Sequence, residues 1–201
     1  MYKRQIQAID AAHAALSSWK NTNPQTRFDI LDNIGRIIIT RQDELGEILA
    51  REEGKTLAEA KGEAFRAGQF FQFYAAEALR RTGEQNLSTR PNIDVEIVRE
   101  PIGVTVLITP WNFPIAIPAW KIAPALAHGN TVVLKPSEIT PASAYHLTKI
   151  MEEAGFPAGV FNLLVAKGEA VGETLVSHPA VAGISFTGSV PTGRKIAQGA
   201  I

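Results

Sequence analysis

The 201-residue chain contains no cysteine, which excludes disulfides, thiolate zinc sites and any thiol nucleophile from these residues. It also has no excess of charge of one sign, because 20 basic residues balance 20 acidic ones and no polybasic run occurs. We therefore expect neither nucleic acid nor an anionic lipid surface as a partner. No apolar run approaches the ~18 residues of a membrane-spanning helix, so we expect no membrane insertion and a cytoplasmic location.

Two common ligand signatures are missing as well. No G-x-G-x-x-G fingerprint occurs, and the segment 188–195 only approximates a phosphate-binding loop. Arg194 stands where that loop needs Lys, and Lys195 stands where it needs Ser or Thr. No Asp follows Asp94 to bind magnesium at a strand end, so the sequence argues against a nucleotide hydrolase. The four histidines show no ligand spacing, and we expect no metal site: His13, His128, His146 and His178.

Charge is unevenly distributed along the chain, with 29 of the 40 charged residues in the first 100 positions. Apolar periodicity there predicts helices over 6–19, 24–54 and 56–81. The second carries Pro24 after Asn23 at its start, and the third carries an aromatic stripe typical of core packing. We therefore expect residues 1–90 to form an N-terminal helical region of the cofactor-binding domain.

Residues 91–201 alternate between short apolar runs and helical patterns, after an extended segment at 93–99. The pattern predicts an α/β fold: an open, mostly parallel, Rossmann-like sheet flanked by helices. In such a sheet a ligand lies beyond the carboxyl ends of the strands. Thr140 and Pro141 are expected to cap and begin the second of these helices. The expected strands are 104–108, 131–134, 160–165 and 181–186, and the expected helices are 115–127, 141–154, 169–177 and 190–198.

The first strand end, Thr109 to Pro114, places Asn112 between two prolines that restrict the backbone. A preorganised amide donor is suited to an oxyanion. The alternative is a proline-rich turn in which Trp111 and Phe113 fill the core.

The other strand ends suit a nucleotide. Lys135 and Glu138 could bind the two hydroxyls of a ribose, or could form a solvated ion pair. Gly168 and Gly172 permit close backbone approach, although glycine is common at helix starts. The final helix begins after Gly188 and Ser189, where free N–H groups suit a pyrophosphate.

Several segments together resemble the NAD(P)-dependent aldehyde dehydrogenase superfamily, in matching order and spacing over about 99–200. They are Pro110-Trp-Asn-Phe-Pro114, Trp120-Lys-Ile-Ala-Pro-Ala-Leu-Ala127, Gly129-Asn130, Lys135-Pro-Ser-Glu138, Ala154-Gly-Phe-Pro-Ala-Gly159 and Phe186-Thr-Gly-Ser189. The stretch Glu52-Glu-Gly-Lys55 also resembles the family.

The resemblance implies the roles of particular residues. Asn112 would hold the oxyanion, and Lys121 would support a proton relay or else form a structural ion pair. Glu138 near the ribose would favour NAD over NADP. Together with Gly168 and Gly172, proposed above from their position, the predicted cofactor-binding residues are Ile108, Thr109, Pro110, Trp111, Lys135, Ser137, Glu138, Phe186, Thr187, Gly188, Ser189 and Thr192.

The resemblance further implies oxidation of a small aldehyde to its acid by a parent protein that is a homodimer or homotetramer. The sequence Ile115-Ala-Ile-Pro-Ala-Trp-Lys121 is most similar to the corresponding sequence in the semialdehyde branch of this family. The family's nucleophilic Cys and general-base Glu would lie beyond Ile201, so we expect a truncated, inactive fragment without the catalytic domain and the subunit-pairing arm. The alternative is a non-catalytic dinucleotide-binding module.

Overall fold

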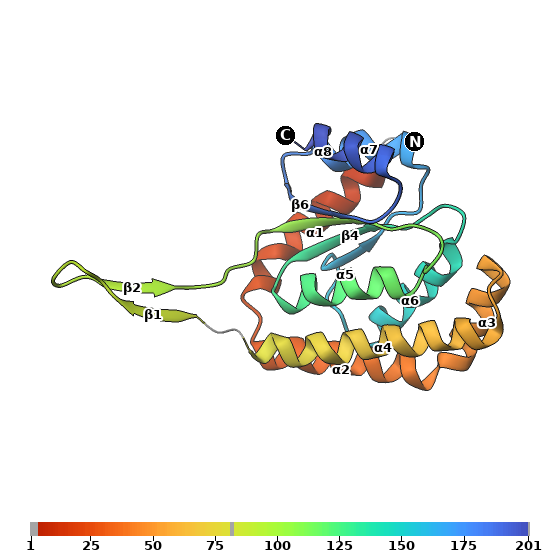
Figure 1. The fold of residues 1–201 in the computed structure, drawn as a ribbon, viewed down its shortest axis with the longest axis horizontal. Helices are drawn as coiled ribbons and strands as arrows, with labels where there is room; N and C mark the ends of the chain where they lie inside the picture. Colours follow the sequence, from red (N-terminus) through yellow and green to blue (C-terminus); the bar gives the residue numbers. More distant parts are fainter. Residues whose placement is uncertain (1–3, 81–82, 201) are drawn as a thin grey trace.

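The computed structural model describes residues 4–80 and 83–200, and it forms the expected α/β fold (Figure 1). Four helices come first, followed by a projecting hairpin and then by alternating strands and helices. The helices are α1 (Arg4–Lys20), α2 (Pro24–Thr40), α3 (Gln42–Glu53), α4 (Leu57–Leu79), α5 (Ala116–Ala127), α6 (Pro141–Glu153), α7 (Gly168–Ser177) and α8 (Val190–Gly199). The strands are β1 (Glu84–Leu87), β2 (Asp94–Ile97), β3 (Val104–Ile108), β4 (Thr131–Lys135), β5 (Phe161–Leu163) and β6 (Val181–Phe186).

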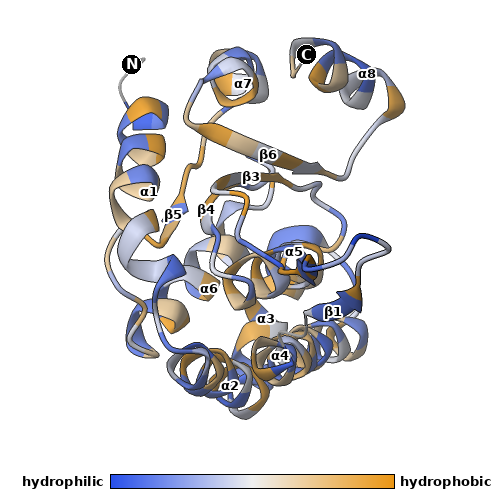
Figure 2. Cartoon of the chain, turned by 90° about the vertical axis from the view of Figure 1, so that its left-hand side faces the viewer, coloured by the Kyte–Doolittle hydropathy of each residue, from blue (hydrophilic) through white to orange (hydrophobic). Residues whose placement is uncertain are grey.

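The central sheet has the strand order β5-β4-β3-β6, and its neighbouring strands are parallel. Helices α1 and α7 cover one face, while α5 and α6 cover the other (Figure 2). The two central strands, β3 and β4, are almost wholly buried, as a parallel sheet covered on both faces requires. Helix α1, predicted over 6–19, therefore packs on the sheet itself. The division of the chain near residue 91 into a helical region and an α/β region stays a prediction.

The single long helix predicted over 24–54 is wrong, because the structure forms α2 and α3 with a break at Arg41. A β-branched run, Ile37 to Thr40, precedes the break, and such residues are poor helix formers. The Arg41 guanidinium binds the Glu153 carboxylate of α6 at 2.8 Å. On the two sides of the break, α2 packs along α4, while α3 packs against both α4 and α6.

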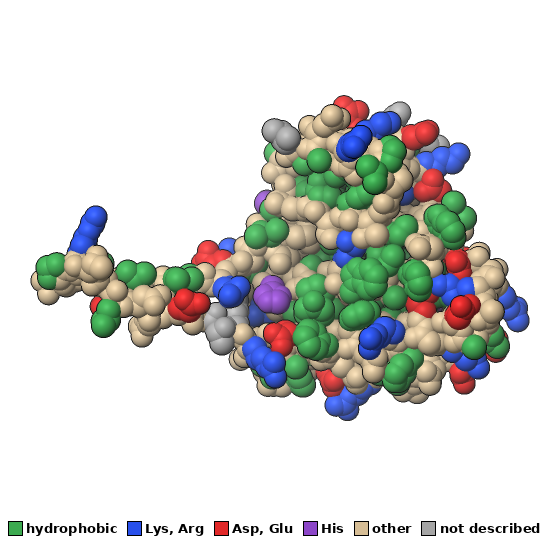
Figure 3. Space-filling model, in the orientation of Figure 1, with side chains coloured by type: hydrophobic (Ala, Val, Ile, Leu, Met, Phe, Trp, Pro, Cys, Tyr) green, Lys and Arg blue, Asp and Glu red, His purple; other side chains and the backbone are tan. Residues whose placement is uncertain are grey.

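Helix α4 was predicted to start at about Thr56. In the structure Thr56 is its N-cap residue and forms a capping box with Glu59. Its predicted end, Arg81, lies outside the described residues. The aromatic stripe is only partly core: Phe71 is fully buried, whereas Phe73 is 58% exposed. Hydrophobic side chains consequently gather on the surface over α4 and α5 (Figure 3).

Strands β1 and β2 form an antiparallel hairpin that projects from the body of the molecule (Figure 1). The sequence indicated only an extended segment at 93–99 and missed β1. The turn signal was present, since Pro91 precedes Asn92, which adopts a left-handed conformation with φ 62°. Every residue of the two strands is exposed. Around β2 the apolar residues Ile93, Val95 and Ile97 alternate with charged ones, whereas Glu84–Leu87 has no apolar alternation that could have revealed β1.

The prediction that the Thr140 side chain caps α6 is also wrong, although its position is right. Thr140 occupies the N-cap position, but its buried hydroxyl makes no hydrogen bond in the described structure. The Glu52 carboxylate of α3 instead accepts hydrogen bonds from the N–H groups of Ala142 and Ser143 and from the Ser143 hydroxyl. An acidic side chain from a distant segment thus satisfies the helix terminus that Thr140 was expected to satisfy.

We expect Thr140→Val to change the free energy of unfolding by less than about 0.5 kcal/mol, because it removes a hydroxyl without a partner at constant volume. By contrast, Asn23→Ala should cost about 1 kcal/mol, since the Asn23 side chain caps α2 at 2.8 Å from the Gln25 nitrogen. Urea unfolding of both variants checks the comparison. A loss of about 1 kcal/mol in Thr140→Val would show that its hydroxyl does cap the helix.

Candidate functional site

Three strands of the sheet end side by side and carry predicted site residues at their ends. Ile108 pairs with Lys135 on β4 and with Phe186 on β6, so these residues form one row. The next residues stay in register, because the Thr109 N–H donates to the Lys135 carbonyl at 3.2 Å and the Thr187 N–H donates to the Ile108 carbonyl at 3.0 Å. The loops that follow β3, β4 and β6 therefore leave the sheet from the same edge.

Lys135 is buried at this edge, while Glu138 is half exposed. The Lys135 ammonium donates to the Glu138 carboxylate at 3.2 Å and to the Pro136 carbonyl at 3.1 Å. The pKa of Glu138 is lowered, chiefly by its own backbone N–H and further by Lys135 and Lys167, so the carboxylate is ionised near neutral pH. The arrangement presents a donor and an acceptor together, which suits hydrogen bonding to two vicinal hydroxyls.

Residues 109–114, here called the Asn112 loop, follow β3. Asn112 is exposed, and among the described residues no hydrogen bond engages its side-chain amide. Its main chain is fixed, however, because the Lys55 ammonium donates to the Asn112 carbonyl at 2.8 Å. The expectation that Trp111 and Phe113 fill the core does not hold: they are 51% and 45% exposed. The loop thus combines a tethered backbone with a free amide.

The carboxylate of Glu63 on α4 completes this tether. It accepts hydrogen bonds from the N–H groups of Ile115 and Ala116, at 2.9 and 3.0 Å, and caps the start of α5. Sequence reasoning missed Glu63 and assigned no role to Lys55. A signal was present, because Glu63 interrupts the buried face of α4 formed by Ala60, Ala64 and Ala67. A carboxylate in an apolar stripe needs buried partners.

Lys121 lies on α5, and its ammonium donates to the Ser185 hydroxyl of β6 at 2.7 Å. Partial burial lowers the pKa of Lys121, which favours loss of its proton at a lower pH than for an ordinary lysine. The structural partner is therefore a hydroxyl rather than the ion-pair partner that we considered. A role in proton transfer stays a prediction.

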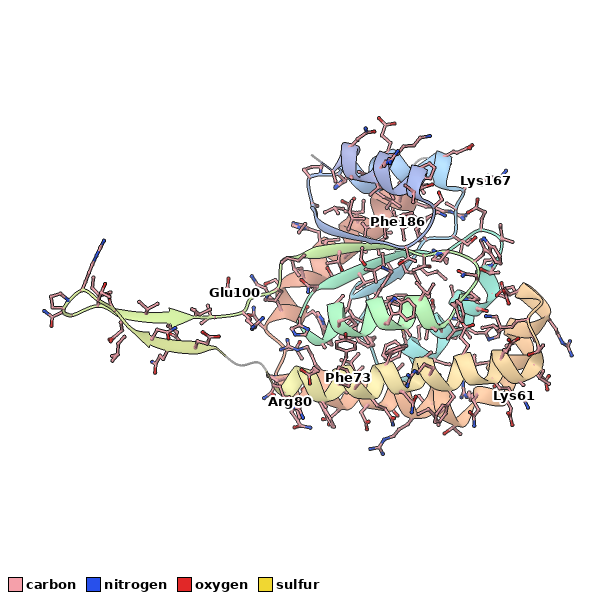
Figure 4. All side chains as sticks on the ribbon, viewed as in Figure 1. Lys61, Phe73, Arg80, Glu100, Lys167 and Phe186 are labelled. Carbon is pink, nitrogen blue, oxygen red and sulfur yellow. The ribbon has the colours of Figure 1, made fainter. Side chains whose placement is uncertain are left out.

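The glycines at the other strand ends differ in their surroundings. A Cβ atom at Gly168 or Gly172 would meet nothing within 4 Å, which leaves room for a ligand against the start of α7. A Cβ at Gly188 would instead lie 2.6 Å from the Phe186 ring, so this glycine is needed for packing. Phe186, at the end of β6, and Lys167, before α7, both lie toward the carboxyl ends of the strands (Figure 4).

Some hydroxyl groups of the predicted cofactor site already form hydrogen bonds within the chain. The Ser189 oxygen caps α8 by accepting from the Thr192 N–H and lies 2.9 Å from the Thr192 hydroxyl. The Ser137 oxygen accepts from the Ile139 N–H at 3.3 Å, which forms a tight turn beside Lys135. The Thr109 hydroxyl is buried and has no partner in the described structure. The hydroxyl groups of Ser189 and Thr192 thus remain accessible to a ligand, and they lie at the positive end of helix α8.

A separate apolar cavity of about 380 Å³ lies among β6, α7 and α8, lined by Val176, Val181, Ile184, Phe186, Ile196 and Ala200. Apart from Phe186 it contains none of the predicted site residues. No helix in the described part of the chain is long and apolar enough to cross a membrane.

Comparison with known proteins identifies the family. The model of the aldehyde dehydrogenase family matches residues 3–201. An α-ketoglutarate semialdehyde dehydrogenase of Haloferax volcanii is 44% identical over 189 residues, which cover 94% of this chain and 39% of that protein. A succinate-semialdehyde dehydrogenase [NADP(+)] of Escherichia coli is 43% identical over 191 residues, or 95% of this chain and 40% of that protein.

Solved structures agree with these relatives. The crystal structure of an Escherichia coli NADP-dependent enzyme superposes with a TM-score of 0.98 at 41% identity, and covers 99% of this chain and 41% of that one. A betaine aldehyde dehydrogenase from Staphylococcus aureus in complex with NAD+ gives 0.96 at 37% identity, with 99% and 40% covered. The chain belongs to the aldehyde dehydrogenase family, and it spans about 40% of the length of these curated relatives.

Proposed function

We propose that this chain is the dinucleotide-binding part of an enzyme that oxidises an aldehyde to its carboxylic acid with NAD+ or NADP+. The alignment of Ile108, Lys135 and Phe186 at one sheet edge is the observation that carries the proposal. The dinucleotide, when bound, accepts the two electrons that leave the aldehyde. Lys135 and Glu138 would hold a ribose, and the N-terminus of α8 with Ser189 would hold the pyrophosphate.

The residues present fit a dinucleotide. The ammonium and carboxylate lie 3.2 Å apart at the rim, and the space over Gly168 and Gly172 is open. Ser189 adds an exposed hydroxyl at the positive end of α8, where its oxygen accepts from the Thr192 N–H. These groups bind and orient the cofactor, and each acts from the end of a rigid strand or the first turn of a helix.

Asn112 would supply the electrostatic part of the chemistry. When a nucleophile attacks an aldehyde carbonyl, negative charge develops on the oxygen, and a preorganised amide donor stabilises that charge. The nucleophile itself cannot be a thiol of these residues, because the sequence has no cysteine. We therefore propose that it belongs to further residues of a longer protein.

The experiment that tests this function is an assay of aldehyde-dependent NADH formation. The full-length protein should oxidise a semialdehyde with NAD+, whereas purified residues 1–201 should give no turnover above the blank. Turnover by residues 1–201 would contradict the assignment of the nucleophile. If the chain binds NAD+ but no longer protein exists, the alternative of a non-catalytic dinucleotide-binding module is favoured.

We propose an aldehyde with a second acid group as the substrate class. Two of the relatives named above support this class, since one is described as an α-ketoglutarate semialdehyde dehydrogenase and the other as a succinate-semialdehyde dehydrogenase, whereas a third is described as a betaine aldehyde dehydrogenase. For the cofactor we propose a preference for NAD+, because an ionised Glu138 beside the ribose would repel the additional phosphate of NADP+. Competing titrations of the two dinucleotides test the preference.

We further propose that the parent protein is a homodimer or homotetramer and that the β1–β2 hairpin contributes to the subunit contact. The sequence led us to expect no pairing arm in this chain. The hairpin nevertheless projects with apolar side chains exposed, and Leu87 is 96% exposed. An exposed two-stranded ribbon gains stability from covering such a surface. Light scattering of the full-length protein with Leu87→Asp tests the contact through loss of the oligomer.

A further inference from the structure

We propose that Lys55 and Glu63 are positioning residues that hold the Asn112 amide in place for aldehyde oxidation. The two side chains bind the main chain on both sides of Phe113 and so fasten the Asn112 loop to α4. The inference rests on the proposed function, because it assigns Lys55 and Glu63 to the same reaction, through Asn112.

Every oxygen of the Glu63 carboxylate is used in this contact. One oxygen accepts from the N–H groups of Ile115 and Ala116, and the other accepts from the Lys55 ammonium at 2.7 Å. The Glu63 side chain is only 2% exposed and that of Lys55 11%, so solvent screens the pair weakly. Such a buried charge pair holds both side chains in place, because displacement of either group leaves a buried charge without a partner.

The Lys55 ammonium has partners on several sides. Besides Glu63 it donates to the Asn112 carbonyl at 2.8 Å, and it lies 3.6 Å from the Glu53 carboxylate. The ring of Phe113 lies 4.1 Å from the ammonium, measured to the ring centroid, which adds a cation–π contact. The ammonium thus contacts both residues joined by the peptide bond after Asn112.

A contact to this carbonyl has a direct consequence for the amide side chain. Because a peptide unit is planar, fixing the direction of the Asn112 carbonyl also fixes the rotation about the bond between its α-carbon and carbonyl carbon. Pro110 and Pro114 restrict the same segment from both ends. The lysine therefore limits the remaining backbone freedom at Asn112, and with it the place of the side-chain donor.

Helix capping alone does not require this arrangement. Glu52 caps α6 through Ala142 and Ser143 in the same manner. Among the described residues, Glu52 forms no ion pair with a lysine and no hydrogen bond with the Asn112 loop. The additional feature at Glu63 is the ammonium that extends from the carboxylate to the Asn112 carbonyl. Glu52 accordingly provides a matched control for the general effect of losing a buried glutamate cap.

The kinetic test uses the full-length protein with a semialdehyde and NAD+. We expect Lys55→Met to lower kcat about 10- to 100-fold with the KM for NAD+ within about twofold, because displacement of a catalytic donor affects the transition state more than cofactor binding. Lys55→Arg, which keeps the charge, should recover part of kcat. Glu52→Gln should keep kcat within about twofold. An equal loss of kcat in Lys55→Met and Glu52→Gln would overturn the inference, since general destabilisation would then explain both.

A double-mutant cycle isolates the route through Asn112. If Lys55 acts by positioning this amide, Lys55→Met should cost less than about threefold in kcat when Asn112→Ala is already present. A full 10- to 100-fold additional loss would contradict the proposed route.

Hydrogen exchange of the same variants gives a readout independent of activity. Lys55→Met should speed amide exchange at Ile115 and Ala116 by at least about tenfold, while Glu52→Gln should do so at Ala142 and Ser143. Unchanged exchange at Ile115 and Ala116 in Lys55→Met would overturn the positioning role even if no substrate were found. Failure of the unmodified protein to oxidise any aldehyde would instead remove the proposed function, so the two failures are distinguishable.

Discussion

Asn112→Ala should lower kcat for aldehyde oxidation by the full-length protein by about 100- to 1,000-fold, the usual cost of removing one oxyanion donor. The large effect is expected because the amide is preorganised. The Lys55 ammonium donates to the main-chain carbonyl of Asn112 at 2.8 Å. In the described structure the Asn112 side chain makes no competing hydrogen bond. A donor that needs no rearrangement contributes fully when charge develops on the substrate oxygen.

Steady-state kinetics with NAD+ saturating checks the prediction, and the KM for NAD+ should stay within about twofold. Asn112→Gln is an informative companion, since it keeps an amide but moves it by one methylene and should still lose most of kcat. Asn33→Ala removes an exposed asparagine on α2 and serves as the control. If kcat of Asn112→Ala were within about threefold of the unmodified protein, Asn112 would not be the oxyanion donor.

Glu63→Ala should destabilise the protein by about 3–5 kcal/mol, the range found when one partner of a buried ion pair is removed. The variant leaves the Lys55 ammonium, of which 11% of the side chain is exposed, without its 2.7 Å carboxylate partner. It also leaves the N–H groups of Ile115 and Ala116 without an acceptor at the start of α5. Urea unfolding measures the loss.

A glutamate on the same helix provides the control. Glu77 pairs with Arg80 at 3.1 Å, but the arginine side chain is 72% exposed. Such surface pairs contribute little, so Glu77→Ala should cost less than about 1 kcal/mol. Equal losses for the two variants would show that burial does not distinguish them and would contradict the account of the Glu63 contact.

The sequence predicted the sheet well because its signals are local. The strands β3 and β4 are short apolar runs between helical patterns, and their loops contain proline or glycine at the right offsets. The common edge of the loops follows from the same alternation, because parallel strands end at one edge. The strand order β5-β4-β3-β6 and the pairing of Ile108 with Lys135 were not predicted and come from the structure.

The contacts that fix the loops could not be predicted, because they join residues far apart in the chain. Glu63 and Ile115 are separated by 52 positions, and Glu52 and Ser143 by 91. Local propensity favours Thr140 as the cap of α6, but the buried carboxylate of Glu52 takes its place. Likewise, the β-branched run before Arg41 only weakens the helix locally, and the packing of α3 against α4 and α6 is not visible in the sequence. Periodicity locates elements but not their partners.

The most direct test of the central claim is a calorimetric titration of NAD+ into residues 1–201. We predict saturable binding that weakens about 10- to 100-fold in Lys135→Ala, because one charge-assisted hydrogen bond of about 1.5–3 kcal/mol is lost. Lys149→Ala, which removes an exposed partner of Glu152, should leave the affinity unchanged. Absence of binding at millimolar NAD+, or equal affinity in Lys135→Ala, would contradict a dinucleotide site at the strand ends.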